Sequence, residues 1–115
     1  MHNFRQLNIW KESMKAAKDI FDLTQTFPKP ELYGLTSQLN RAAVSVPSNI
    51  AEGVGRNTDK EFKRFLNIAL GSCFEIETQL LLAKDFGFVT TEQIEQLINK
   101  IILIQKMISG FKKSL

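Results

Sequence analysis

The chain holds very few of the residues from which metal and catalytic sites are usually built. It has one histidine, His2, and one cysteine, Cys73, among its 115 residues. His2 stands at the terminus, where chains fray, so we expect no histidine-based metal site or catalytic triad within one chain and no bound cofactor. The single cysteine excludes an internal disulfide, which fits a reducing compartment.

Long apolar runs and a secretory leader pattern are also missing. No uninterrupted apolar stretch approaches the roughly 20 residues that a membrane-spanning helix needs. Residues 1–5 lack the charged-then-apolar pattern of a signal peptide, and no segment shows the sustained alternation of a strand. We therefore expect an all-α, cytoplasmic protein with no membrane partner.

Three features that superficially suggest chemistry have simpler interpretations. Residues 53–56 (Gly-Val-Gly-Arg) resemble a phosphate loop, but they follow a helical pattern and lack the Gly-Lys-Ser/Thr ending. Cys73 falls on an apolar stripe, where a buried small side chain is favoured over a nucleophile. Glu75 and Glu77 would point about 200° apart on a helix, which disfavours an acid–base pair. The sequence therefore predicts that the protein is not an enzyme.

Apolar residues recur at spacings of three and four in four segments, which is the period of an amphipathic helix. The four stripes are Leu7, Trp10, Met14, Ala17, Phe21 and Thr24; Leu35, Leu39, Ala42, Val46 and Ile50; Phe62, Phe65, Leu66, Ala69, Cys73, Ile76, Leu80 and Ala83; and Ile94, Leu97, Ile98, Ile101, Ile104, Ile108 and Phe111. Short connections favour antiparallel neighbours. Residues 1–115 are therefore predicted to form a single domain, an antiparallel up-down-up-down four-helix bundle.

Stop and cap signals separate the four stripes. Residues 27–30 (Phe-Pro-Lys-Pro) end the first helix, because proline lacks the amide donor. Residues 58–61 (Thr-Asp-Lys-Glu) have the spacing of a capping box, Gly87 ends the third helix, and a threonine at 90–91 caps the fourth. Pro47 conflicts with this pattern. It predicts a kink in the second helix and a carbonyl without its usual donor.

The fourth helix contains an apolar turn that covers its whole circumference. Ile101, Ile102, Leu103 and Ile104 are consecutive, and four residues at about 100° each surround a helix. Every helix of a lone four-helix bundle has a solvent face, so this turn predicts an oligomer interface. The alternative is a wide core face with one exposed apolar residue, and we favour self-association over it.

A polar stripe runs along the second predicted helix. It consists of Gln38, Arg41, Ser45, Asn49, Glu52 and Arg56. If the second and third helices fold back around a turn near Asn57, Arg41 comes to the level of Glu75. We predict a structural ion pair between Arg41 and Glu75 that fixes the register of the two helices. A binding groove along this stripe is the alternative.

Several motifs carry a resemblance to a known family. They are Phe27-Pro28, Glu31-Leu-Tyr-Gly-Leu-Thr-Ser-Gln38, Arg41-Ala-Ala, Ser45-Val-Pro-Ser-Asn-Ile-Ala-Glu-Gly53, Gly55-Arg56, and Gly71-Ser72 with Glu75. The chain resembles, from Leu7 to the fourth helix, the four-helix-bundle proteins encoded in intervening sequences of bacterial 23S ribosomal RNA, also labelled S23 ribosomal protein. It is similar as well to the accessory variability determinant of diversity-generating retroelements.

The resemblance implies a fold and an assembly more than a function. Relatives form up-down bundles that assemble as homopentamers, so a ring-like homo-oligomer is expected. Their molecular role is uncharacterised. The retroelement relatives bind nucleic acid and a reverse transcriptase, which makes RNA or DNA a candidate partner.

The charges are distributed unevenly along the predicted bundle. Residues 1–15, 49–67 and 104–115 should share one end, which we call the basic pole. It holds ten cations and four anions, a net +6, whereas the rest of the chain carries −3. The candidate phosphate contacts within it are Arg56, Lys60, Lys63, Arg64, Lys112 and Lys113. A merely solvated surface is the alternative, because few aromatic residues accompany these cations.

Two functions follow as hypotheses. The leading one is a non-enzymatic oligomer that binds structured RNA or DNA, or a ribonucleoprotein, through phosphate contacts at the basic pole. The alternative is a protein-interaction scaffold whose ring binds a protein partner and has no direct nucleic-acid role. In both, the first partner of the chain is another copy of itself.

Overall fold

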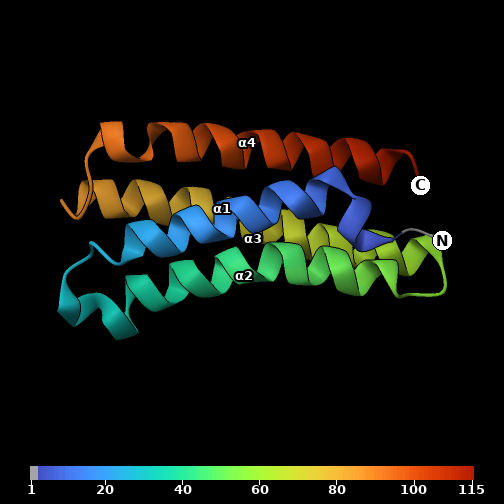
Figure 1. Ribbon diagram of the computed structural model, residues 1–115, viewed down its shortest axis with the longest axis horizontal. Coiled ribbons are helices and arrows are strands. Elements are labelled where there is room, and N and C mark those ends of the chain that lie inside the picture. The colour runs from blue at the N-terminus through green and yellow to red at the C-terminus, as the bar shows by residue number, and fades with distance from the viewer. Residues whose placement is uncertain (1–2) are drawn as a thin grey trace.

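The computed structural model describes residues 3–115, apart from the side chain of Tyr33, so His2 lies outside the described residues. The elements are η1 (Phe4–Gln6), α1 (Asn8–Thr24), η2 (Lys29–Tyr33), α2 (Leu35–Val54), α3 (Asp59–Asp85) and α4 (Thr91–Lys113), where η denotes a 3-10 helix. Figure 1 shows the four long helices lying side by side. Residues 3–115 contain no strand, so the predicted all-α fold of four helices is confirmed.

Each long helix packs against two of the others. α1 and α3 both contact α2 and α4. The extents of 44 × 24 × 19 Å agree with the roughly 40 Å that the 27 residues of α3 span at 1.5 Å per residue. The start of α1 and the end of α4 lie at the end of the bundle where α2 turns into α3 (Figure 1). The three segments assigned to the basic pole therefore meet at one end of the molecule.

The two helix starts predicted from threonines differ in how completely they are capped. At the start of α4, the Thr90 hydroxyl accepts from the Gln93 amide at 3.2 Å and the Gln93 side chain accepts from the Thr90 amide at 2.7 Å. This is a complete capping box. At α3, Thr58 accepts from the Glu61 amide at 3.1 Å, but the Glu61 carboxylate bonds Arg64. The capping box predicted there is only half formed, because Arg64 offers Glu61 a charged donor.

The glycine and the proline that were predicted to interrupt helices affect the backbone differently. Gly87 follows α3 with a φ of +80°, a conformation that glycine adopts without strain. Pro47 lies inside α2, which continues on both sides of it. Proline removes the donor for the Ala43 carbonyl, and on the next turn the Asn49 side chain donates to the Ser45 carbonyl at 2.8 Å. Side-chain hydrogen bonding thus stabilises the turns around the proline.

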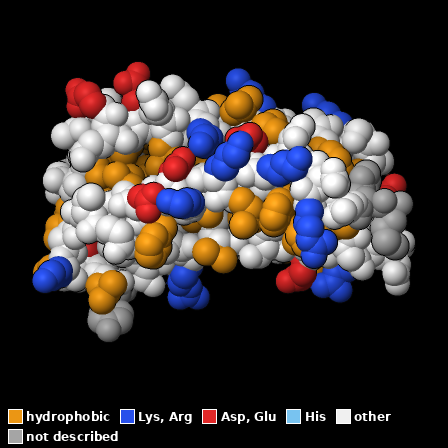
Figure 2. Space-filling model, in the orientation of Figure 1, with side chains coloured by type: hydrophobic (Ala, Val, Ile, Leu, Met, Phe, Trp, Pro, Cys, Tyr) orange, Lys and Arg blue, Asp and Glu red, His pale blue; other side chains and the backbone are white. Residues whose placement is uncertain are grey.

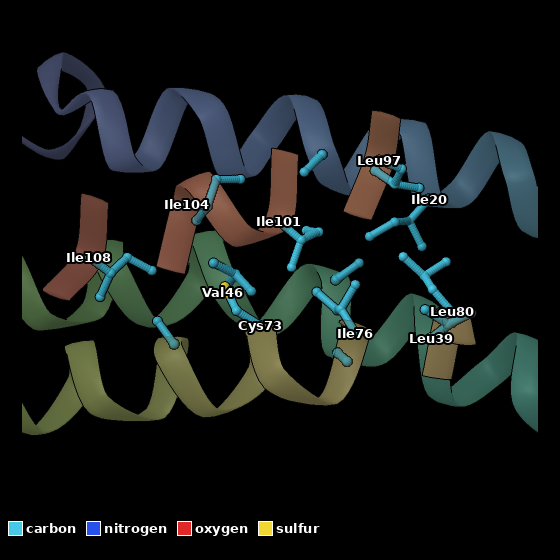
Figure 3. Close-up of a cluster of buried hydrophobic side chains, with 14 of the residues drawn as sticks. Ile20, Leu39, Val46, Cys73, Ile76, Leu80, Leu97, Ile101, Ile104 and Ile108 are labelled. Carbon is cyan, nitrogen blue, oxygen red and sulfur yellow. The ribbon is translucent and has the colours of Figure 1, made fainter. Parts of the chain in front are cut away.

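The core is a continuous row of branched aliphatic side chains from all four helices. The largest fully buried residues are Ile20, Leu39, Ile50, Leu66, Ile76, Leu80, Ile94, Ile101, Ile104 and Ile108. Figure 3 shows several of them, including Ile20, Ile76, Ile101 and Ile104, meeting between the helices, with Cys73 nearby. Each such side chain stabilises the fold by about 1.5–3 kcal/mol relative to an exposed one. Three of the four apolar stripes read from the sequence are therefore faces that form the core.

The first stripe is wrong: α1 buries Ile9, Ala16 and Ile20, whereas Met14 and Phe21 of the predicted stripe are 46% and 55% exposed. α1 has apolar residues on two adjacent faces, and periodicity alone does not decide which of them is buried.

α3 is the one helix in residues 3–115 that is long and apolar enough to cross a membrane by length and composition. Central helices of bundles also have this property. Between residues 65 and 83 its charged residues are Glu75 and Glu77 alone. Its inner stripe is buried, yet Ile68, Phe74 and Leu81 remain 41%, 52% and 41% exposed on the outside. The apolar character of α3 thus comes from both of its faces.

The end of α2 and the start of α3 are in very close contact at Gly53. A Cβ atom added to Gly53 would lie 2.8 Å from Phe62 Cδ1 and 3.0 Å from Phe65 Cβ. Real side chains almost never approach that closely. The absence of a side chain at Gly53 therefore sets the distance between the two helices at the basic pole.

Substitution of Gly53 by alanine should destabilise the fold. Alanine normally favours a helix interior by up to about 1 kcal/mol over glycine, but here the methyl group would push α2 away from Phe62 and cost about 1–3 kcal/mol. Gly110→Ala is the matched control, since an added Cβ there meets nothing within 4 Å inside α4. Urea unfolding should show a lower midpoint for Gly53→Ala and an equal or higher midpoint for Gly110→Ala. Equal effects of the two changes would contradict the close contact.

Candidate nucleic-acid interface

Contacts between the helix ends assemble the basic pole. Lys112 near the end of α4 donates to the Asn67 side chain of α3 at 2.7 Å. The rings of Phe62 in α3 and Phe111 in α4 lie 5.6 Å apart and join the same two helices. Gly53 brings the end of α2 against the same segment of α3. Three separate stretches of sequence therefore form one continuous surface.

The six candidate phosphate contacts have different environments. Arg56 pairs with Glu52 and Arg64 with Glu61, each at 3.2 Å, and both pairs are exposed. Exposed pairs of this kind contribute little, typically about 0.2–1 kcal/mol. Among residues 3–115, Lys60, Lys63 and Lys113 have no carboxylate within 4.0 Å. The pole thus offers lysines without partners beside arginines whose carboxylate partners are weakly bound.

Lys and Arg side chains also predominate over this end in the space-filling view. Figure 2 shows them mainly on the right, the side of the chain termini in Figure 1, and acidic side chains mainly on the left. A separation of charge along a bundle creates a potential that attracts anions to one end. The uneven distribution counted from the sequence is therefore visible on this face of the folded chain.

Phe65 has an environment that sequence reasoning missed. The guanidinium carbons of Arg56 and Arg64 lie 4.5 and 4.8 Å from the centre of its ring, and Phe65 is only 6% exposed. The periodicity predicts Phe65 on the core stripe with Phe62 and Leu66. An aromatic residue directly after an arginine, opposite a Gly-x-x-Arg segment, is the signal that could have revealed the arrangement. Phe65 instead lies at the edge of the core, beneath two cations.

Arg41 and Glu75 line the same groove but do not form the predicted ion pair. The groove runs between α2 and α3, has a volume of about 410 Å³, and is lined by Gln38, Arg41, Ala42, Ser45, Ser72 and Glu75. No ion pair within 4.0 Å in the described chain includes either residue, and both are exposed. The predicted ion pair is therefore not formed among residues 3–115, and neutral side chains make the contacts between the two helices instead.

Short neutral side chains, rather than charges, join α2 to α3. The hydroxyls of Ser45 and Ser72 lie 2.7 Å apart. The Gln79 side-chain Nε2 donates to the side-chain Oε1 of Gln38 at 3.4 Å, while the buried Oε1 of Gln79 has no partner among the described residues. The serine side chains are small, so they let the helix backbones approach closely. Register is therefore specified by small polar pairs and by Gly53.

The four residues predicted as an oligomer interface lie mostly inside the subunit. Ile101 and Ile104 are each 1% exposed in the core, Ile102 is half-buried, and Leu103 is 55% exposed. The interface prediction is wrong for Ile101 and Ile104, because α4 turns a wide apolar side toward α1 and α3. The alternative of a broad core face with one exposed apolar residue describes this turn better.

A different surface combines exposed apolar side chains with few charges. Residues 35–51 of α2 include one charged residue, Arg41, whereas α1 contains six in 17 residues. We call the outward sides of residues 35–51 and 65–83 the charge-poor face. Its exposed large apolar side chains are Val44, Ile68, Phe74, Leu81 and Leu82. Depletion of charge with retained aromatic and aliphatic residues is typical of the centre of a protein–protein interface.

The candidate metal ligands and the single cysteine have plain environments in the described part of the chain. Between residues 3 and 115, no three His, Cys, Asp or Glu side chains are grouped so that they could hold a metal ion. Cys73 is fully buried in the core. Burial raises the pKa of its thiol to about 12, because the apolar surroundings disfavour the thiolate. Cys73 thus has the structural role that its place on the stripe predicted.

The fold and this surface define the chain as a small four-helix bundle with one basic end. It belongs to the 23S rRNA-intervening sequence protein family, whose family model matches residues 5–110. It is similar to the crystal structure of a protein of unknown function from the S23 ribosomal protein family of Bacteroides thetaiotaomicron VPI-5482. The two are 26% identical with a TM-score of 0.85, and the match covers 91% of this chain and 98% of that one. Comparison with curated proteins gives no match.

The Cys73 thiol should be inert in the folded protein. At about pH 8 a thiol with a pKa near 12 is almost wholly protonated, and the thiolate is the reactive form. We expect the rate of disulfide exchange with an aromatic disulfide reagent to be very low in buffer and to rise across the urea unfolding transition. Fast labelling without denaturant would contradict the burial of Cys73.

Proposed function

We propose that the protein is a non-enzymatic, cytoplasmic homo-oligomer that binds structured RNA or DNA, or a ribonucleoprotein, through the basic pole. The observation that carries this proposal is the net charge of +6 on the pole against −3 on the rest of the chain. Nucleic-acid backbones present one negative charge per phosphate, and neutralising them releases counterions. A cationic end surface on an otherwise acidic bundle is suited to that partner.

The pole favours contacts to phosphates over contacts to bases. Lys60, Lys63 and Lys113 have no carboxylate partner among the described residues and present flexible point charges. Phe62 and Phe65 are buried, so neither ring is free for a base to stack on. Binding should therefore be strong at low salt and should discriminate weakly between sequences.

Self-association through the charge-poor face would strengthen this binding. In the proposed assembly, antiparallel up-down-up-down bundles form a ring, and the family resemblance implies a homopentamer. Val44 and Phe74 are 58% and 52% exposed on adjacent helices, which is costly for a surface that faces only water. Arg41 and Glu75 are a cation and an anion without partners within that face, so they can pair between subunits. A parallel ring would place every basic pole on one rim.

Charge introduced on the charge-poor face should break the assembly. We expect several times the 13.1 kDa subunit mass for the unmodified protein in light scattering coupled to size exclusion. Phe74→Glu should give the subunit mass, because a buried unpaired carboxylate is very unfavourable. Leu103→Glu is the matched control, a similarly exposed apolar residue on α4, and should keep the oligomer. A monomeric parent protein, or dissociation by Leu103→Glu alone, would exclude this interface.

Reversal of charge at the pole should abolish nucleic-acid binding. The variant Lys60→Glu, Lys63→Glu and Arg64→Glu removes three cations and adds three anions on one exposed surface. Fluorescence anisotropy with a labelled RNA should show at least a hundredfold weaker binding, roughly what the loss of several phosphate contacts costs. Reversal of Lys18, Lys29 and Lys84, which lie outside the pole, is the matched control and should change affinity little. Circular dichroism should be unchanged in both, since exposed substitutions cost little stability.

The second candidate function is a protein-interaction scaffold with no direct nucleic-acid role. The charge-poor face favours it, because that surface fits a protein better than it fits a phosphate backbone. The ratio of absorbance at 260 and 280 nm of the purified protein, before and after a high-salt wash, separates the two. Co-purifying nucleic acid that salt removes supports the leading function, and a parent protein that binds no RNA or DNA at low salt would leave the scaffold.

A further inference from the structure

We propose that Arg56 and Arg64, both held against the ring of Phe65, form a seat for one phosphate group of a nucleic-acid backbone. This inference rests on the proposed function and gives it a specific anchor within the basic pole. The remaining cations of the pole would attract the backbone from a distance, whereas this pair would fix where one phosphate lies. Phe65 is a positioning residue in this arrangement, since it touches the arginines and not the phosphate.

The ring of Phe65 holds two guanidinium groups from different helices. The guanidinium carbon of Arg56, just beyond α2, is 4.5 Å from the ring centre, and that of Arg64, in α3, is 4.8 Å from it. Both distances lie within the roughly 6 Å at which cation–π attraction acts. A planar guanidinium placed on a ring loses part of its conformational freedom before any ligand arrives. Both guanidinium carbons are thereby held within 4.8 Å of the centre of one ring.

The local backbone explains why both arginines reach the ring of Phe65. Gly53 lets α2 approach α3 until its missing Cβ would be 3.0 Å from Phe65 Cβ. Arg56 follows Gly53 by three residues and so emerges beside the Phe65 ring. Arg64 precedes Phe65 in α3 and reaches the ring from its own helix. A side chain at residue 53 would separate the helices and move Arg56 from the ring.

Enough donors remain free on both arginines to hold an oxyanion. Arg56 uses Nη2 to bond Glu52, and Arg64 uses Nε to bond Glu61, each at 3.2 Å. A guanidinium has five N–H donors, and the two side chains are 44% and 59% exposed. Each carboxylate fixes one edge of its guanidinium and leaves the other N–H groups available. This geometry suits the tetrahedral oxygens of a phosphate, which planar guanidinium groups bind through paired hydrogen bonds.

Glu52 and Glu61 also explain why the placement of the two guanidinium groups matters more than their net charge at the seat. Glu52 and Glu61 largely offset the charges of Arg56 and Arg64, so long-range attraction to the seat must come from neighbours such as Lys60, one turn before Arg64 and exposed. Replacement of either arginine by lysine would keep the net charge. It would remove the planar guanidinium group that stacks on the ring and donates paired hydrogen bonds. Charge-conserving substitution therefore tests the seat separately from the pole.

The experiment compares reciprocal exchanges of the two cation types. The probe is a short fluorescein-labelled RNA with hydroxyl termini, titrated with the oligomer at constant salt. Arg56→Lys with Arg64→Lys should weaken binding by about tenfold, the order of effect expected when charge-assisted paired hydrogen bonds are lost. Lys112→Arg with Lys113→Arg is the matched control at the same pole, and its affinity should stay within about twofold of the parent.

Two further arms test the positioning role and the source of the phosphate. Phe65→Leu keeps every charge and an apolar side chain, and should weaken binding about threefold or more through loss of the ring. Its thermal unfolding is followed in parallel, so that a loss of fold is not mistaken for a loss of affinity. The same RNA carrying a 5′-phosphate should bind equally well. A requirement for that group would overturn the assignment of the seat to the backbone.

The outcomes separate this inference from the proposed function. Parent-like affinity of the Arg56→Lys, Arg64→Lys variant, together with loss of binding on charge reversal of Lys60, Lys63 and Arg64, would overturn the seat and leave the basic pole intact. Loss of affinity in the lysine variant, with the Lys112→Arg, Lys113→Arg control unchanged, is the expected result. A parent protein that binds no RNA would overturn the proposed function, and this inference with it.

Discussion

The packing of α2 directly against α3 is the contact on which the rest of the structure depends. Small groups make it possible: Gly53 at one end, where a Cβ would lie 2.8 Å from Phe62, and the Ser45–Ser72 hydroxyl pair at 2.7 Å in the middle. Because the helices approach closely, their charged side chains cannot fit between them and point outward. Arg56 is thereby placed on Phe65, and Arg41 and Glu75 remain on the surface without an ion-pair partner among residues 3–115.

The same arrangement divides the surface of the bundle into regions of different character. Charges concentrate on α1, α4 and the helix ends of the basic pole, while the outward sides of α2 and α3 keep apolar residues such as Phe74. One surface is suited to phosphates and the other to protein. In the account proposed here, the two act together, since subunits joined through the charge-poor face would present several basic poles in one array.

Much of the fold could be predicted from the sequence, because apolar periodicity and caps are local signals. The stripes containing Leu39, Leu66 and Ile101 are all core faces, and Thr90 caps α4. The errors concern the choice of face on α1, where Ile20 and not Phe21 is buried, and side chains at helix surfaces. Counting equal numbers of residues back and forward from the turn places Arg41 at the same height along the bundle as Glu75. Two residues at the same height need not touch, and this pair is not formed. Likewise, the apolar turn at Ile101 is explained by the width of the core, which depends on where α1 and α3 lie. The distances between helices are set by tertiary packing, and no short stretch of sequence encodes them.

The central claim is that the basic pole binds nucleic acid through several phosphates. It is tested most directly by the affinity of the unmodified oligomer for a labelled RNA between about 50 and 200 mM salt. The account predicts that the logarithm of the association constant falls linearly with the logarithm of salt concentration, with a slope of roughly −2 or steeper, as several released counterions require. A slope near zero, or no measurable binding at the lowest salt, would contradict it.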